Sequence, residues 1–372
     1  MQKPLTFEGL KANVTSLITA NNLASSNLNV TRDNSIGLID KIGLIVNLDT
    51  NYQEDKLAFM DDYYELPFGK TIEEWNEDLI YPIDTSLHND EEALKDWTGS
   101  HRPATYSYTI GEKTIPQTIK DNDFNRAVNN AEQMASVVAI KTKRINDSMS
   151  AYRYAVKKEM VGKYIAKVES ALGSGSATFA TGTAYNNGAY VHSGTDYGVV
   201  VNAIPASNTQ TFAQLVTAGS IVTLGNMVEV VARPANTATG EAFIKAIKST
   251  LEYAKDMNSG YALSGMQLGA TEGLVLLINK GIIPSLEVDT MAGAFNKDEL
   301  LTGVEMIAID FGSYTGNAYA ILTDRRTLRL HNSFRQTGTQ RNEFKHFTNI
   351  FAHTEDTAFA SVNTFVKVFK SA

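Results

Sequence analysis

The chain of 372 residues contains no cysteine. It therefore has no disulfide framework, no thiolate nucleophile and no cysteine-ligated zinc or iron–sulfur cluster. It also lacks the apolar run of roughly 18 to 20 residues that a membrane helix needs. Residues 1–10 show neither the charged nor the apolar region of a signal peptide. We therefore expect a soluble protein without membrane contact, made inside the cell and stabilised by packing, hydrogen bonds or association of copies.

Positive charge is in short supply. Lys and Arg number 33 against 41 Asp and Glu, which gives a formal net charge of -8. A dedicated nucleic-acid binder would show a basic excess or a basic stripe. With 43% hydrophobic and 20% charged residues, the composition is that of a folded chain, and its length suggests two or three domains.

The motifs of common enzyme classes are absent from the sequence. It has no phosphate-binding loop, no dinucleotide fingerprint, no His-Glu-x-x-His and no Gly-x-Ser-x-Gly elbow. Asp310, Phe311 and Gly312 spell the magnesium motif of protein kinases, but the other kinase motifs are missing, so we interpret the match as chance. We expect no enzymatic activity, no cofactor, and no catalytic, cofactor-binding or metal-binding residues.

Two groups of residues are candidate metal-binding sites. His346 and His353 lie seven residues apart with Glu355 and Asp356 nearby, but scattered structural histidines are the favoured interpretation. An acidic group could bind calcium or supply paired carboxylates. Its members are Asp61, Asp62, Glu65, Glu73, Glu74, Glu77 and Asp78. The spacing of a calcium loop is absent, so a solvated or inter-subunit face is favoured.

Basic residues gather in two places. One group comprises Lys141, Lys143, Arg144, Lys157 and Lys158, and the other Arg325, Arg326, Arg329, Arg335 and Arg341. Either group could contact phosphates weakly. We favour salt bridges to the acidic segment of a neighbouring copy.

Residues 121–172 give the clearest structural signal. They contain no proline and no glycine before Gly162, and apolar residues recur at helical spacing. The stripe runs through Phe124, Ala127, Val128, Ala131, Ala135, Val138, Ile145, Met149, Tyr152, Val156, Met160, Tyr164, Val168 and Leu172. A continuous helix of this extent would span roughly 75 Å. The pattern predicts one long spine helix, with a break near 143–147 left open because the stripe shifts there.

Residues 1–120 are expected to form extended segments outside the compact core. Residues 1–60 are polar and have only short apolar runs. Such a stretch is either a frayed terminus or an arm that orders against a neighbour, and we take the arm as the working hypothesis. In 61–120, β-prone runs at 106–110 and 114–119 flank Gly111, Glu112 and Lys113, which predicts a projecting hairpin. Pro116 places the second run on an edge.

The remainder alternates in type. Residues 173–235 look β-rich, with Gly and Asn between the runs. A helix is expected over about 239–256, strands over 273–278, 304–309 and 318–322, and a short helix near 289–295. Strands at 327–330 and 365–369 close the chain. The β/α alternation over 235–325 predicts a compact mixed domain in which helices cover a sheet.

This order of elements resembles the major capsid proteins of tailed bacteriophages. Stretches similar to the small podovirus branch are FGKTI at 68–72, TYSYTI at 105–110, TIKD at 118–121, FNRA at 124–127, LLINK at 276–280, DTMA at 289–292, FN at 295–296 and LTDRR at 322–326. The resemblance implies an α+β fold shared with encapsulins and the floor of herpesvirus capsids. The implied parts are an N-terminal arm (1–60), an extended loop (61–120), a peripheral domain (121–234) with the spine helix (121–172), an axial domain (235–325) and return strands of the peripheral domain (326–372).

The same resemblance implies a function. The chain would assemble with itself into hexamers and pentamers of an icosahedral shell around double-stranded DNA, which it contacts weakly and without sequence specificity. A scaffolding protein, a portal and decoration proteins are implied partners. The subunit would be made in the host bacterial cytoplasm and end in the virion. Some relatives crosslink a loop lysine, but Lys113 has no suitable partner nearby. An encapsulin-type compartment and a ligand-binding module remain as alternatives.

Overall fold

The computed structural model describes residues 55–62, 72–74, 104–105, 107–120, 131–225, 227–255, 261–265, 273–285 and 304–372. These fall into two compact units, which we describe separately. The first takes its described residues from 55–62, 108–120, 131–157 and 330–358, and the second takes the rest. The arm residues 1–54, three of the seven acidic residues (Glu65, Glu77 and Asp78) and the helix expected near 289–295 lie outside the described residues.

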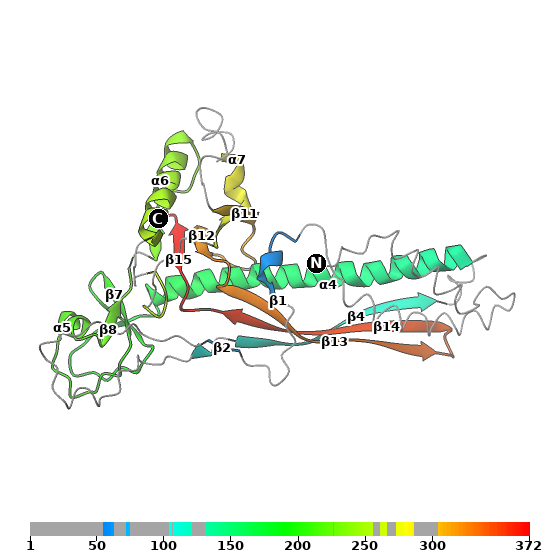
Figure 1. The fold of residues 1–372 in the computed structure, drawn as a ribbon, viewed down its shortest axis with the longest axis horizontal. Helices are drawn as coiled ribbons and strands as arrows, with labels where there is room; N and C mark the ends of the chain where they lie inside the picture. The colour runs from blue at the N-terminus through cyan, green and yellow to red at the C-terminus, as the bar shows by residue number, and fades with distance from the viewer. Residues whose placement is uncertain are drawn as a thin grey trace, which may run out of the picture. The chain divides into compact units, whose positions relative to one another are not determined.

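The first unit is built on a four-stranded sheet in the order β1-β13-β14-β4 (Figure 1). Its strands are β1 (Asp61–Asp62), β13 (Leu328–Asn342), β14 (Phe347–Ala360) and β4 (Ser107–Lys120). β1 runs parallel to β13 and pairs with Leu330 and His331. A tight turn joins β13 to β14, and His346 in that turn has a left-handed backbone with φ of 49°. This long β13–β14 hairpin was only partly predicted, since β14 was missed.

Strand β4 corrects the predicted hairpin. Residues 107–120 form one continuous strand, so Gly111, Glu112 and Lys113 are not a turn. Thr114 and Thr118 bond across to His353 and Asn349, at 3.0 and 2.8 Å, which places β4 along β14. Because glycine is tolerated within a strand that a long partner supports, the turn signal was misleading. β4 is the outer strand of the described sheet, in agreement with the position predicted from Pro116.

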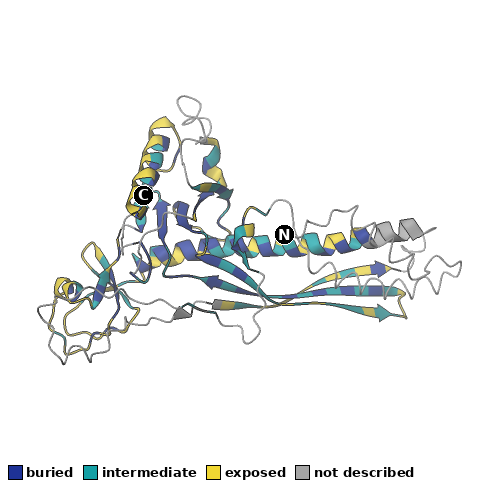
Figure 2. Ribbon diagram, viewed as in Figure 1, coloured by how far each residue is buried: buried dark blue, intermediate teal, exposed yellow. Residues whose placement is uncertain are grey.

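The expected spine helix is α4, which runs over Ala131–Ala171. At 41 residues it spans about 60 Å. Fully or largely buried positions recur every fourth residue along one face, namely Ile145, Met149, Arg153, Lys157, Val161 and Ile165 (Figure 2). The predicted stripe is confirmed at Ile145, Met149, Tyr164 and Val168, whereas Tyr152, Val156, Met160 and Leu172 are only half-buried. The side chains of its first part, Phe124 to Val138, lie outside the described residues. Two charged residues occupy the middle of the buried face instead.

The second unit contains a five-stranded sheet in the order β11-β10-β12-β15-β9. The strands are β11 (Glu305–Ile309), β10 (Leu274–Asn279), β12 (Ala318–Asp324), β15 (Val366–Lys370) and β9 (Val228–Val230). Helix α6 (Thr237–Lys255) packs its Phe243 and Ile247 against Leu276, Tyr319 and Phe369 of this sheet. Phe243 makes edge-to-face contacts with both Tyr319 and Phe369. The predicted helix and the strands of 273–322 are therefore present.

The closing strands divide between the two sheets. β13 and β14 belong to the sheet with β4, whereas β15 pairs with β12 and β9 in the five-stranded sheet. The resemblance had assigned all of 326–372 to one domain. Phe369 of β15 and Phe365, which directly precedes this strand, complete the core under α6 with their large rings. Shorter elements are η1 (Ala58–Met60), η4 (Lys280–Ile282), α7 (Ile283–Ser285) and the pair β2 (Glu73–Glu74) and β3 (Ala104–Thr105).

A smaller sheet follows α4 in the second unit. Its order is β5-β6-β7-β8, with β5 (Ala177–Thr178), β6 (Tyr190–Ser193), β7 (Asp196–Val200) and β8 (Ile221–Thr223). Helix α5 (Phe212–Thr217) begins at a capping box in which Thr211 and Gln214 bond each other's backbone amides. Phe212, Tyr185 and Val200 form a separate core. None of the helices within the described ranges has the length and apolar character needed to cross a membrane.

Candidate functional site

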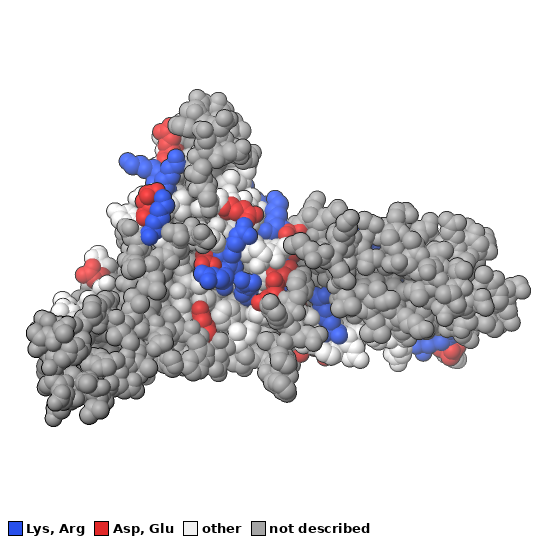
Figure 3. Space-filling model, in the orientation of Figure 1, with Lys and Arg blue, Asp and Glu red and all other residues white. Residues whose placement is uncertain are grey.

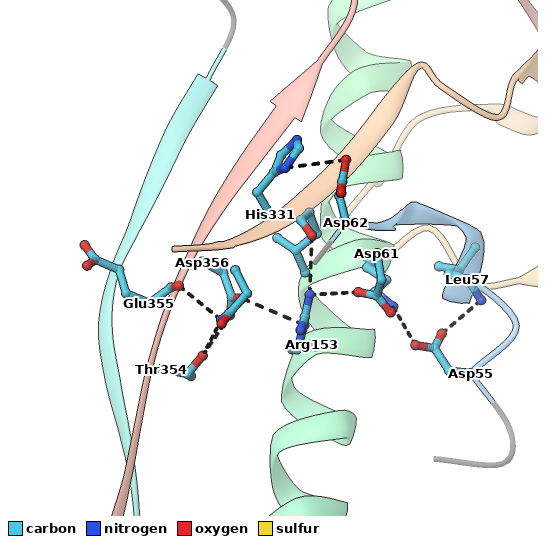
Figure 4. Close-up of polar contacts among 12 residues, drawn as sticks. Asp55, Leu57, Asp61, Asp62, Arg153, His331, Thr354, Glu355 and Asp356 are labelled. Atoms are coloured by element: carbon cyan, nitrogen blue, oxygen red, sulfur yellow. Dashed lines mark hydrogen bonds and ion pairs between the residues drawn. The ribbon is translucent and has the colours of Figure 1, made fainter. Parts of the chain in front are cut away.

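Two cations and three carboxylates meet on the buried face of α4 and form what we call the ionic cluster. Its members are Asp55, Asp61, Arg153, Lys157 and Asp356 (Figure 4). The Lys157 side chain is fully buried, and its Nζ lies 2.5 Å from Asp55 Oδ2 and 2.5 Å from Asp61 Oδ2. One lysine thus holds both ends of the short segment that precedes and forms β1.

Arg153, one helical turn earlier, ties the same segment to the sheet. Its Nη2 donates to Asp61 Oδ1 at 2.8 Å and to the Leu330 carbonyl at 3.3 Å. Its Nε lies 3.8 Å from Asp356 Oδ1. Asp356 in turn accepts from Asn332 Nδ2 at 2.9 Å. The cluster therefore joins α4, β1, β13 and β14, all within the first unit.

Apolar packing closes this cluster to water. Leu57 and Met60 are fully buried next to it, and the Leu57 amide donates to Asp55 Oδ1 at 2.9 Å. Burial, together with the nearby Asp356 charge, raises the pKa of the Tyr152 phenol above its usual value. Removing the Arg153 and Lys157 cations from water costs several kcal/mol of desolvation free energy per ion, and only closely placed carboxylates offset this cost. The arrangement therefore favours one register of residues 55–62 on the helix over any alternative.

A second set of polar contacts lies on α4 within the second unit, against the loop after β11. Lys158 Nζ lies 2.9 Å from Asp310 Oδ2, and Glu159 accepts from the Ser313 amide and hydroxyl at 2.9 and 2.6 Å. Tyr314 donates to Glu169 Oε2 at 2.5 Å. This geometry gives the Asp-Phe-Gly triplet a structural role, because the Asp310 carboxylate pairs with a lysine.

These contacts shift the pKa values of two carboxyls. Burial acts to raise the pKa of Asp310, but hydrogen bonds from Lys158 and the Gly312 amide, with the charge of Lys158, outweigh it and lower the pKa. Hydrogen bonds from Ser313 lower the pKa of Glu159. Both groups are therefore held in their ionised form by the packed loop.

The structure does not bring the candidate metal ligands together. Among the described residues, no three histidine or acidic side chains are placed to hold an ion. His353 lies against Thr114 and Glu112, whereas Asp356 belongs to the ionic cluster. Asp61 and Asp62 face Lys157 and His331, so they are internal anchors and not a solvated face. His88 and His101 lie outside the described residues.

The basic groups are largely engaged inside their own chain. Lys157 and Lys158 pair with Asp61 and Asp310, so the prediction that they bridge to a neighbouring copy is wrong. Internal partners also exist for Arg325, Arg326 and Arg341, which pair with Glu305, Asp324 and Glu343. Blue and red atoms accordingly lie next to one another on the face seen in Figure 3. Lys143 and Arg144 are exposed.

Sequence reasoning missed the ionic cluster. Arg153 lies 92 residues from Asp61, and Lys157 lies 102 residues from Asp55. No local motif connects partners so far apart. The one signal available was the interruption of the apolar stripe by charges at Arg153 and Lys157, four residues apart on the same face.

Comparison with solved structures identifies the class of fold. A chain in the capsid structure of Staphylococcus phage Andhra superposes with a TM-score of 0.53 at 12% identity, covering 86% of this chain and 84% of that chain. A chain in the structure of the head fiber and inner core protein gp22 of native bacteriophage P68 gives 0.50 at 12% identity, covering 83% of each chain. The α+β fold is therefore one that phage capsid structures contain, as the resemblance predicted.

The family follows from the sequence itself. No curated protein sequence matches the chain. Residues 7–370 match the model of the Phi29-like phage major capsid protein, and the chain belongs to that family. It is thus a structural subunit of a bacteriophage capsid, and the expected capsid identity is confirmed.

Proposed function

We propose that copies of this chain assemble into the closed icosahedral shell of a tailed phage, as hexamers and pentamers around double-stranded DNA. The observation that carries this proposal is the family match over residues 7–370. A scaffolding protein, a portal and decoration proteins are the proposed partners, and DNA is contacted weakly and without sequence specificity. The subunit is made in the host bacterial cytoplasm and becomes part of the virion.

The role is structural and not enzymatic. Support comes from the engaged state of the charged residues, because the cluster on α4 holds ion pairs buried in the fold and not groups open to a substrate. The domain division also stays part of this proposal: an arm (1–60), an extended loop (61–120), a peripheral domain (121–234 and 326–372) and an axial domain (235–325). Within it, β15 packs with the axial elements.

We assign the ionic cluster the task of fixing residues 55–62 on α4. This segment spans the boundary between the proposed arm (1–60) and the proposed extended loop (61–120). An anchored junction gives every copy the same starting point for both appendages, and a regular shell requires such uniformity. Charge complementarity sets the register here, as a buried polar group does in other assemblies.

The test is assembly of the full chain, alone and co-expressed with a scaffolding protein. Size-exclusion chromatography and negative-stain microscopy should show closed particles that elute in the void volume. A monodisperse monomer under every salt and scaffold condition would contradict the proposal.

A further inference from the structure

The segment after α4 is almost free of charge. Between residues 170 and 228 the sequence contains a single Asp, Glu, Lys or Arg, namely Asp196. The whole chain has 20% charged residues, so about one residue in five would be expected here. We call residues 172–225 of this stretch the neutral lobe.

Burial does not explain why the neutral lobe has so few charged residues. It has its own sheet, β5 to β8, and its own small core around Tyr185, Phe212 and Ile221. Phe179 stacks on Tyr185 at 5.5 Å and meets Phe212 edge-on at 5.8 Å. Its remaining side chains are largely exposed, as the yellow of α5 illustrates (Figure 2). Exposed positions include Thr181, Thr183, Asn186, Asn187, Thr195, Asn202, Ser207, Thr209 and Gln210. The lobe thus presents a hydrophilic surface on which the exposed Asp196 is the single charged residue.

The contrast with a nearby element of the same unit is sharp. Exposed positions of α6 carry charges of both signs, as expected for a helix that faces water. They are Glu241, Lys245, Lys248, Glu252 and Lys255. In Figure 3, blue and red atoms mix over α6. Charged residues are therefore scarce on this one lobe and not on the surface in general.

Rotational symmetry gives a physical reason for such a surface. Where identical copies meet around an axis, a charge close to the contact faces the same charge on its neighbours and repels it. Charged residues are correspondingly depleted in the buried centre of interfaces. Short Thr, Ser and Asn side chains also lose little conformational entropy when a neighbour covers them.

We propose that the neutral lobe is a contact surface between copies of this chain in the assembled shell. This inference rests on the proposed function, namely that the chain forms a shell. The lobe approaches its neighbours through uncharged polar groups, so contact does not require the desolvation of charges.

The test places like charges on the lobe. Asn187 and Thr209 are exposed. Asn187→Glu with Thr209→Glu, and separately both to Lys, should leave folding unchanged and reduce the yield of shells at least ten-fold. An equimolar mixture of the Glu and Lys proteins should restore shells, because unlike charges then meet. Ala242→Glu with Ser249→Glu on the exposed side of α6 is the control and should assemble as the wild type does.

The outcomes separate the possible partners. Shells at wild-type yield from each variant alone would overturn the proposal, and the lobe would then face DNA or another virion protein. A mixture that stays unassembled would overturn it as well. If the first pair misfolds, Thr183→Glu with Ser207→Glu repeats the test at other exposed sites. A failure of the proposed function looks different, since the wild type itself would not assemble, and the inference would fall with it.

Discussion

Lys157 Nζ lies 2.5 Å from Asp61 Oδ2, although 96 residues separate the two in sequence. The lysine is fully buried, and the Asp61 side chain is only 8% exposed. Neither charge has much access to water, so each depends on the other. The free energy of unfolding should therefore fall when a substitution removes either charge and leaves the other one buried.

We expect Lys157→Met to lower the free energy of unfolding of the unassembled subunit by about 3–5 kcal/mol, because Asp55 and Asp61 would stay buried without their shared cation. Urea unfolding followed by circular dichroism measures this change. Adding Asp55→Asn and Asp61→Asn to Lys157→Met should recover part of the loss. No recovery would show that the lysine acts through packing of its aliphatic chain alone.

Lys367 is the matched control, since it is also buried but has a different partner. Its Nζ lies 3.0 Å from Glu229, which is 36% exposed, and 5.6 Å from the centre of the Tyr261 ring. Lys367→Met leaves a carboxylate that water can still reach. We expect the stability at pH 7 to stay within about 1 kcal/mol of the wild type or to rise. A loss as large as that of Lys157→Met would contradict this view of the two lysines.

The pH dependence of Lys367 follows from its pKa. Burial lowers the pKa of this lysine below 10.5, and Glu229 offsets the shift only in part. The unfolded chain therefore binds the proton more tightly, so the contribution of Lys367 to stability increases as the pH rises toward 10.5. The wild type should gain stability relative to Lys367→Met between pH 7 and pH 10 in urea titrations. A difference that is independent of pH would refute the shift.

Gly162 of α4 lies directly under the carbonyl of Phe311. A Cβ at position 162 would overlap that oxygen, which is a backbone atom and cannot turn aside. Gly162→Ala should therefore destabilise the subunit by about 1–3 kcal/mol despite the better helix propensity of alanine. Gly338→Ala is the control, because nothing lies within 4 Å of a Cβ there. Equal thermal midpoints for the two variants would show that the loop can withdraw from the helix.

Acid should loosen the loop that packs on α4. The pKa values of Asp310 and Glu159 are lowered from 3.8 and 4.5, so their stabilising contribution is complete above these values and is lost as the pH falls through the folded-state pKa values. Thermal midpoints of the wild type should drop below about pH 4. Glu159→Gln should lower the midpoint at pH 7 and weaken the acid dependence. If Glu159→Gln lost stability below pH 4 as steeply as the wild type does, groups other than Glu159 would cause the acid sensitivity.

The sequence predicted helices and strands well where apolar residues recur at a single helical or strand spacing. α6 and the strands β10, β11 and β12 carry unbroken apolar patterns, and each is found within a few residues of its predicted place. α4 was predicted for the same reason. Local turn chemistry misled at Gly111, because whether a glycine ends a strand depends on the partner strand.

The ionic cluster could not be predicted from local pattern. Arg153 and Lys157 look like solvent-facing residues until the distant Asp55, Asp61 and Asp356 are placed beside them. Strand β14 was missed for a related reason, since His353, Glu355 and Asp356 interrupt its apolar alternation. In both cases a charge on a buried face is meaningful only with its tertiary partner.

The position of Pro116 on the outer strand β4 bears on the time before assembly. A long outer strand on a free subunit offers a template for unplanned pairing with another chain. Pro116 removes one amide donor from that strand, while Glu112, Lys113 and Lys120 put exposed charges along it. Such a strand discourages fibre-like aggregation of subunits that are not yet covered by a neighbour.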